Sequence, residues 1–146
     1  MRVIKTVEEY LEEGVIKKVS PDIQRANDLL FESKRKKQLL QKMIKNLGVD
    51  DSNANDYIEY CYNIIMFLIR SHMLRQGFTS SGRGAHEAEV SFTKKLNFSS
   101  SETQILDQLR YFRNGILYYG KRFDREYAEK IIEFTKQIYI KLTNEK

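Results

Sequence analysis

The chain has 146 residues, about the length of one domain, and a formal net charge of +5. Its 41% hydrophobic and 31% charged residues are typical of a globular chain, and no apolar run approaches the roughly 20 residues that span a bilayer. The single cysteine, Cys61, excludes an internal disulfide and a multi-cysteine metal site. We therefore expect a cytoplasmic protein without a membrane segment, a secretory leader, a cofactor or a metal.

Two helices are predicted in the first third of the chain. Apolar residues recur on one face of residues 3–13, which predicts a short N-terminal helix. Ser20-Pro21-Asp22 is typical of a helix start, with the serine as the cap and the proline at the first helical position. The helix that follows runs to Leu47, because Gly48 favours a helix end.

The second half of this long helix is basic on its outer side. Residues 34–45 include no acid, and five basic side chains lie opposite the apolar face: Lys34, Arg35, Lys37, Lys42 and Lys45. This basic face is either a solvated helix surface or an electrostatic footprint for a nucleic-acid backbone.

The middle of the chain predicts a buried helix, a flexible loop and a short helix. Residues 55–75 leave little polar surface, so we expect them to form the central helix. Residues 76–84 hold three glycines without the spacing or lysine of a phosphate-binding loop. The short helix then runs over residues 85–96. His86 stands near its start beside Glu87, either as a structural histidine or as a ligand-binding or acid–base group.

The last third predicts two more long helices. Overlapping capping boxes, Ser99 with Glu102 and Ser101 with Gln104, begin the first, and Asp124 caps the second, which runs to Leu142. No strand, repeat or long linker is evident. We expect one all-α domain over residues 1–146, an up-and-down bundle of four long helices with short accessory helices. Its core covers about residues 20–142, and residues 3–13 form an N-terminal accessory helix.

One residue of the third long helix breaks its pattern. At about 100° per residue, an apolar arc forms on this helix, and Arg113 falls inside it. The arc consists of Ile105, Leu106, Leu109, Phe112, Ile116, Leu117 and Tyr119. Because burying an unpaired guanidinium is very costly, Arg113 must lie at an edge, or line a cleft or interface that supplies anions.

Other polar residues stand close to Arg113 in the sequence. Asn114 and Tyr118 are four residues apart and can meet on one face, and Arg110 lies on the Asn114 side. Arg113 and Tyr118 are five apart, or about 140° around a helix, so they do not face one another in a regular helix. A distortion at Gly115, or a second copy of the chain related by a two-fold axis, would bring them together.

The run from Arg113 and Asn114 to Tyr118-Tyr119-Gly120 resembles the signature of the HEPN family (higher eukaryotes and prokaryotes nucleotide-binding). That signature is an arginine, usually followed by asparagine, and then a histidine after four to six residues. The upstream layout is also similar to archaeal and bacterial members. It consists of a central helix over residues 56–74, a Gly-Phe loop, and a small-residue loop that ends at His86. The resemblance covers roughly residues 20–142.

The resemblance implies a homodimer in which both subunits line a cleft. Many members are metal-independent ribonucleases, often toxins paired with a nucleotidyltransferase-type antitoxin, while others bind nucleotides or have no known activity. Arg113 and Asn114 carry over directly, but Tyr118 stands where the family has its histidine. A phenol, with a pKa near 10, is a poor general base at neutral pH, although it can donate a hydrogen bond to a phosphate.

Three hypotheses follow. The first is a HEPN-like protein that binds RNA or a nucleotide in a cleft around Arg113, with substrate contacts from Asn114, Tyr118, Arg110 and His86 and little or no catalysis. The second is a structural or protein-interaction bundle. The third is an active metal-independent ribonuclease, such as the toxin of a toxin–antitoxin pair, with Arg113 and Tyr118 as its catalytic residues. The basic face at residues 34–45 distinguishes the ligands: on the same side as Arg113 it favours RNA, and on the opposite side a nucleotide or no ligand.

Overall fold

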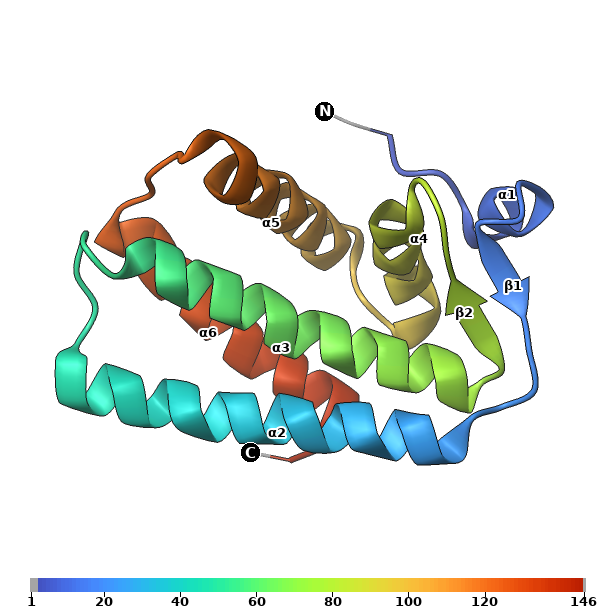
Figure 1. The fold of residues 1–146 in the computed structure, drawn as a ribbon, viewed down its shortest axis with the longest axis horizontal. Coiled ribbons are helices and arrows are strands. Elements are labelled where there is room, and N and C mark those ends of the chain that lie inside the picture. The colour runs from blue at the N-terminus through green and yellow to red at the C-terminus, as the bar shows by residue number, and fades with distance from the viewer. Residues whose placement is uncertain (1–2, 146) are drawn as a thin grey trace.

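The computed structural model describes residues 3–145 of the chain. Within that range the chain is mainly helical, as predicted, with a small sheet beside the N-terminal helix (Figure 1). The elements follow in the order α1 (Val7–Glu12), β1 (Ile16–Lys18), α2 (Ile23–Leu47), α3 (Ala54–Arg75), β2 (Phe78–Ser80), α4 (Ala85–Phe92), the 3₁₀-helix η1 (Thr93–Leu96), α5 (Ser100–Tyr119) and α6 (Arg125–Thr143).

The prediction that the chain has no strand is wrong. β1 and β2 pair antiparallel, with Lys17 opposite Thr79. Gly77 leads into β2 with a φ of 85°, and a Cβ atom there would lie 2.8 Å from the carbonyl oxygen of Val19. Each strand has only three residues, too few to show an alternating pattern, and its partner is far away in the sequence. The pairing therefore comes from tertiary structure and has no local sequence signal.

The sheet also changes the start of α2. The carboxylate of Asp22, and not the hydroxyl of Ser20, caps this helix by accepting a hydrogen bond of 3.0 Å from the backbone N–H of Arg25. The backbone N–H groups of Val19 and Asp22 donate to the carbonyls of Gly77 and Leu74, which ties the chain to the end of α3. This tie delays the helix until Ile23, so the predicted serine cap is corrected to an aspartate cap.

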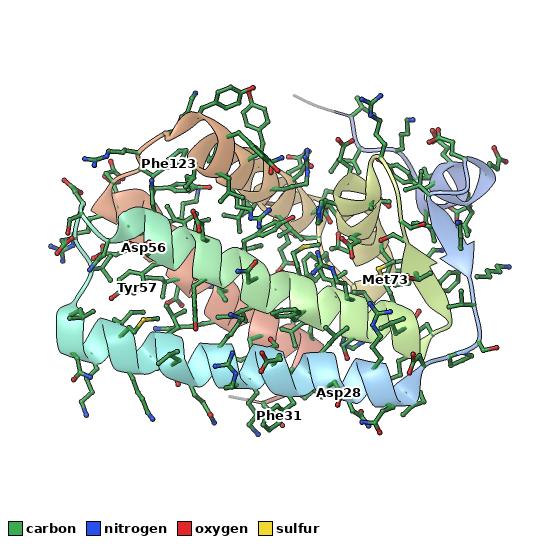
Figure 2. The ribbon with its side chains drawn as sticks, viewed as in Figure 1. Asp28, Phe31, Asp56, Tyr57, Met73 and Phe123 are labelled. Atoms are coloured by element: carbon green, nitrogen blue, oxygen red, sulfur yellow. The ribbon has the colours of Figure 1, made fainter. Side chains whose placement is uncertain are left out.

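α3 is the central helix, as predicted. α2 packs along one side of it and α6 crosses behind it (Figure 1). Buried side chains from α1 to α6 form one hydrophobic cluster, to which α3 contributes most. Figure 2 shows Tyr57 of α3 facing α2, whereas Phe31 lies on the side of α2 away from α3 and is exposed. Cys61 is fully buried in this cluster, and burial raises the pKa of its thiol to about 12, so it is an inert core residue.

α5 begins at the first of the two predicted capping boxes. The hydroxyl of Ser99 accepts from the backbone N–H of Glu102 at 3.1 Å, and the Glu102 carboxylate accepts from the N–H of Ser99 at 2.8 Å. The second predicted box, Ser101 with Gln104, does not cap the helix, because α5 has already begun at Ser100.

This difference predicts a contrast between two neighbouring serines. We expect Ser99→Ala to lower the free energy of unfolding by about 1 kcal/mol, because the backbone N–H of Glu102 loses its acceptor, the Ser99 hydroxyl. Ser101→Ala is the matched control and should stay within about 0.5 kcal/mol of the wild type. Urea unfolding followed by circular dichroism measures both, and equal losses would contradict the assignment of the cap.

The other end of α5 is fixed against α3. Gly120 ends the helix with a φ of 63°. Asn55 then holds the following loop, since its side-chain amide donates to the carbonyl of Lys121 at 2.7 Å and accepts from the N–H of Phe123 at 3.0 Å. These bonds hold the loop that follows α5 against the first turn of α3.

Candidate functional site

Arg113 points from α5 toward α3. Its guanidinium carbon lies 5.1 Å from the centre of the Tyr62 ring, which is cation–π geometry. The side chain is partly buried, and its Nε–H is enclosed without a hydrogen-bond acceptor in the described part of the chain. No carboxylate pairs with Arg113 among residues 3–145. Of the positions that the apolar arc left open for Arg113, an edge of the helix or a cleft or interface, the side chain takes a partly buried one over Tyr62.

Tyr62 is the buried centre of this region. Its hydroxyl has no hydrogen-bond partner within residues 3–145. Burial raises the pKa of Tyr62 to about 12, and the Glu89 carboxylate acts in the same direction. Three guanidinium groups act in the opposite direction, those of Arg70, Arg110 and Arg113. The phenol therefore lies within electrostatic reach of all three arginines, and we call these four residues the arginine–tyrosine cluster.

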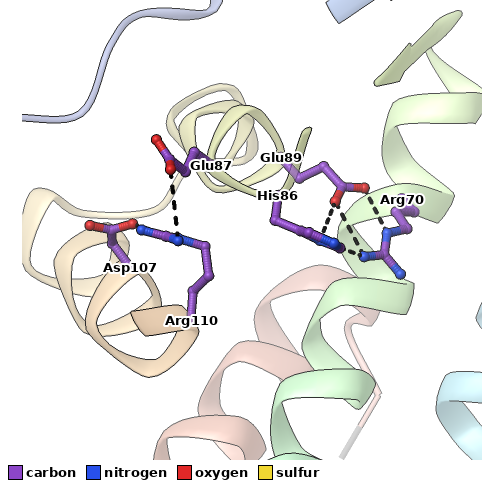
Figure 3. A network of polar contacts seen from close by, with 6 residues as sticks. All are labelled: Arg70, His86, Glu87, Glu89, Asp107 and Arg110. Carbon is purple, nitrogen blue, oxygen red and sulfur yellow. Dashed lines mark hydrogen bonds and ion pairs between the residues drawn. The ribbon is translucent and has the colours of Figure 1, made fainter. Parts of the chain in front are cut away.

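Arg110, one turn before Arg113, is the most buried of the three arginines. Its side chain is 6% exposed, and its Nε donates to Asp107 at 3.0 Å. Nη1 lies 3.9 Å from a carboxylate oxygen of Glu87 on α4, as Figure 3 shows. Nη2 is enclosed and has no acceptor in the described residues. Arg110 thus joins α5 to α4 and keeps one donor uncommitted.

The third arginine belongs to a network around the buried Glu89, between α3 and α4. Arg70 donates to Glu89 from Nε at 2.6 Å and from Nη2 at 3.2 Å, and His86 Nδ1 lies 3.3 Å from the same carboxylate (Figure 3). Burial of Glu89 opposes its ionisation, but hydrogen bonds from His86 and Arg70 outweigh that effect and hold the pKa of Glu89 below its usual value. The carboxylate is therefore ionised and fixes both partners.

Chemically, the arginine–tyrosine cluster is a set of hydrogen-bond donors. The Tyr62 hydroxyl, the Arg110 Nη2 and the Arg113 Nε are enclosed without acceptors in the described residues. A buried polar group without a partner costs about 1–3 kcal/mol. The oxygens of an anion satisfy such donors, and charge-assisted hydrogen bonds to an anion are roughly twice as strong as neutral ones. The chemistry of these donors, though not a cavity between them, therefore suits a phosphate or a carboxylate.

The five residues predicted for the site do not all come together. Arg110 and Arg113 share the cluster, and His86 joins the adjoining network through Glu89. Tyr118 is 74% exposed, and neither it nor Asn114 makes a side-chain hydrogen bond within residues 3–145. α5 is unbroken through Gly115, so the distortion that would turn Tyr118 toward Arg113 is not present. Within one chain, Arg113 and Tyr118 lie on different sides of α5.

Sequence reasoning missed three of the central residues: Tyr62, Arg70 and Glu89. A usable signal existed for Glu89, because it lies in the apolar part of α4, between Ala88 and Val90. An acid in such a position needs a cation to face it. The cation stands on another helix, and the sequence does not show which one.

The basic face of α2 lies away from this cluster. α2 and α5 are on opposite sides of α3 (Figure 1). Several of its cations are also engaged: Arg35 pairs with Glu32, Lys34 lies 3.8 Å from a carboxylate oxygen of Glu145, and Lys37 lies 4.1 Å from the ring centre of Tyr139. The face is thus largely a solvated helix surface with local partners.

The described residues contain neither a group suited to hold a metal ion nor a membrane-spanning helix. No group of three or more histidine, cysteine or acidic side chains within residues 3–145 is arranged to hold a metal ion. No helix in that range combines the length and hydropathy needed to cross a bilayer.

Comparisons with protein-family models, with curated proteins and with solved structures found no match.

Proposed function

We propose that this chain is a HEPN-like helical protein that binds a nucleotide or RNA through phosphate groups at Arg113, with little or no catalysis. The observation that carries the proposal is the arginine–tyrosine cluster, in which three enclosed donor atoms have no acceptor in the described residues. Arg113 supplies a positive charge that no carboxylate of residues 3–145 neutralises. The oxygens of a phosphate accept hydrogen bonds from donors of this kind, and its negative charge would balance that of Arg113.

A nucleotide is favoured over a long RNA. RNA affinity comes largely from several cations along the phosphate backbone. The basic face of α2 is separated from α5 by α3, so it does not extend the cluster into a continuous basic track. A compact ligand with one to three phosphates matches the cluster better.

Weak or absent cleavage follows from the position of Tyr118. A general base must come within hydrogen-bond reach of the proton it removes. Tyr118 is exposed on a different side of α5 from Arg113, so one chain does not combine these two groups. In the proposed HEPN arrangement, an up-and-down bundle that pairs as a homodimer, a second copy would be needed to supply the phenol. The ribonuclease and toxin alternative depends on such pairing.

The alternative of an interaction bundle has its own support. The outer side and the end of α5 expose large aromatic side chains, those of Tyr111, Tyr118 and Tyr119. Exposed aromatic residues are enriched where proteins contact one another. If this surface is the functional one, Arg113 has no ligand and serves only to cover Tyr62.

Calorimetric titration with AMP tests the proposal. We expect saturable binding that Arg113→Gln weakens by at least about tenfold, since hydrogen bonds to charged groups contribute about 1.5–3 kcal/mol each. Arg122→Gln, which removes an exposed charge from the following loop, is the control with the same net charge and should bind AMP as the wild type does.

Single-stranded RNA provides the second arm of this test. Equal AMP affinity in the wild type and Arg113→Gln would overturn the proposed site. Cleavage of the RNA that is lost in both Arg113→Gln and Tyr118→Phe would instead establish the ribonuclease alternative. Absence of both binding and cleavage would favour the interaction bundle.

A further inference from the structure

A separate cavity of about 430 Å³ lies between α2, α3, β2 and the first turn of α4. Small-molecule pockets typically range from about 300 to 1,000 Å³. None of the three residues that supply the enclosed donors of the arginine–tyrosine cluster, Tyr62, Arg110 and Arg113, lines this cavity. Arg70 is the one member of the cluster that also borders the cavity. The cavity therefore needs its own explanation.

The cavity has one apolar side. Its wall is built from five large side chains, Leu29, Phe67, Met73, Leu74 and Phe78. Phe67 and Phe78 are only partly buried, so their rings are not covered completely by the protein. Aromatic rings and methionine sulfur make favourable contacts with other rings. This wall therefore suits a planar apolar body.

The polar side of the cavity carries a net positive charge. Glu89 is occupied by Arg70 and His86, which leaves the pair of Arg70 and Glu89 neutral in sum. Arg25 of α2 also lines the cavity, and its guanidinium has no hydrogen bond or ion pair within residues 3–145. The Nη1 group of Arg70 is likewise not engaged by Glu89. Two guanidinium groups can therefore donate into the cavity, and only one carboxylate balances them.

We propose that this cavity binds a small aromatic acid, with its ring on the apolar wall and its single carboxylate or phosphate group between Arg25 and Arg70. Glu89 holds the Arg70 guanidinium in place, so that donor is fixed before the ligand arrives. Arg25 is exposed and supplies the uncompensated charge. This proposal does not depend on the proposed nucleotide site, because the apolar wall and Arg25 belong to this cavity alone.

Four probes separate the contributions of the ring and the charge. Benzoate and phenyl phosphate carry both features, benzyl alcohol carries only the ring, and inorganic phosphate only the charge. We expect titration with either aromatic acid to shift the amide NMR signals of cavity residues such as Phe78 and His86 until they saturate. Both acids should bind with higher affinity than benzyl alcohol or inorganic phosphate. Whichever of benzoate and phenyl phosphate binds more tightly identifies the preferred anionic group.

Substitutions then locate the anion. Arg25→Gln should weaken binding of the preferred acid by about tenfold, which is the usual scale for one charge-assisted contact. Arg75→Gln is the matched control, because Arg75 lies nearby and bonds Asn27 at 2.9 Å but does not line the cavity. Arg113→Gln should also leave this binding unchanged, which separates it from the nucleotide site.

Three results would overturn the inference. The first is the absence of saturable shifts with either acid. The second is equal affinity for benzyl alcohol, which would assign the cavity to neutral apolar ligands. The third is unchanged affinity in Arg25→Gln.

Discussion

Arg70→Met is expected to lower the free energy of unfolding by about 3–5 kcal/mol, because it leaves a buried carboxylate without its main partner. The Glu89 side chain is 6% exposed and accepts two hydrogen bonds from Arg70, at 2.6 and 3.2 Å. Its remaining partner, His86, is more than half exposed and is charged only when protonated. Methionine keeps most of the volume of the arginine side chain, so the loss reports charge and hydrogen bonding. Equilibrium urea unfolding measures it.

An exposed ion pair in the same chain supplies the control. Arg35 pairs with Glu32 at 2.6 Å, as short a contact as that of Arg70, but both side chains are about half exposed. Exposed pairs contribute little to stability, so Arg35→Met should leave the urea midpoint close to that of the wild type. A similar small change for Arg70→Met would show that Glu89 is not isolated from water.

The double variant Arg70→Met/Glu89→Met tests the cause of the loss. Apolar residues often replace a buried ion pair without loss of stability, because the desolvation cost of both charges disappears. We therefore expect the double variant to regain most of the stability lost in Arg70→Met. If it is less stable than the single variant, the network stabilises the fold through something other than compensation of the Glu89 charge.

Local signals in the sequence predicted much of the helical structure. The Ser99–Glu102 box and the Asp124 cap lie within one turn of the groups they bind, so their effect is independent of the rest of the chain. The start of α2 shows where such signals fail. Serine and aspartate are equally favourable helix caps, so Ser20 and Asp22 could not be told apart by residue type. The aspartate is the cap because backbone hydrogen bonds tie residues 19–22 to the end of α3. That choice depends on contacts between distant residues.

The candidate site also combines a feature that the local sequence predicts with features that depend on contacts between distant residues. Helical periodicity placed Arg113 inside an apolar arc, and its side chain lies partly buried over Tyr62, but Leu117 and Tyr119 of the same arc are exposed. Its neighbours Tyr62 and Arg70 come from α3, which looked uniformly apolar, and Glu89 comes from α4. Only the packing of three helices brings these groups together. Periodicity identifies which face of a helix turns inward, and it does not identify what that face meets.

Tyr62→Phe is expected to raise the free energy of unfolding by about 1–3 kcal/mol, because it removes a buried hydroxyl that has no partner in the described residues. Tyr57→Phe is the matched control on the same helix. The Tyr57 hydroxyl donates to the Gly48 carbonyl at 3.0 Å, so its removal should cost about 1 kcal/mol. Thermal and urea unfolding of the two variants should therefore give changes of opposite sign.

The same substitution should act in the other direction on the proposed ligand. If the Tyr62 hydroxyl donates to a phosphate beside Arg113, Tyr62→Phe should weaken AMP binding by about tenfold while the protein becomes more stable. A gain in stability with a loss of binding is the pattern of a group kept for function at a cost to the fold. A loss of stability in Tyr62→Phe, like that in Tyr57→Phe, would mean that the hydroxyl has an acceptor in solution. The arginine–tyrosine cluster would then be a structural contact, and the surface of α5 would be the better place to look for function.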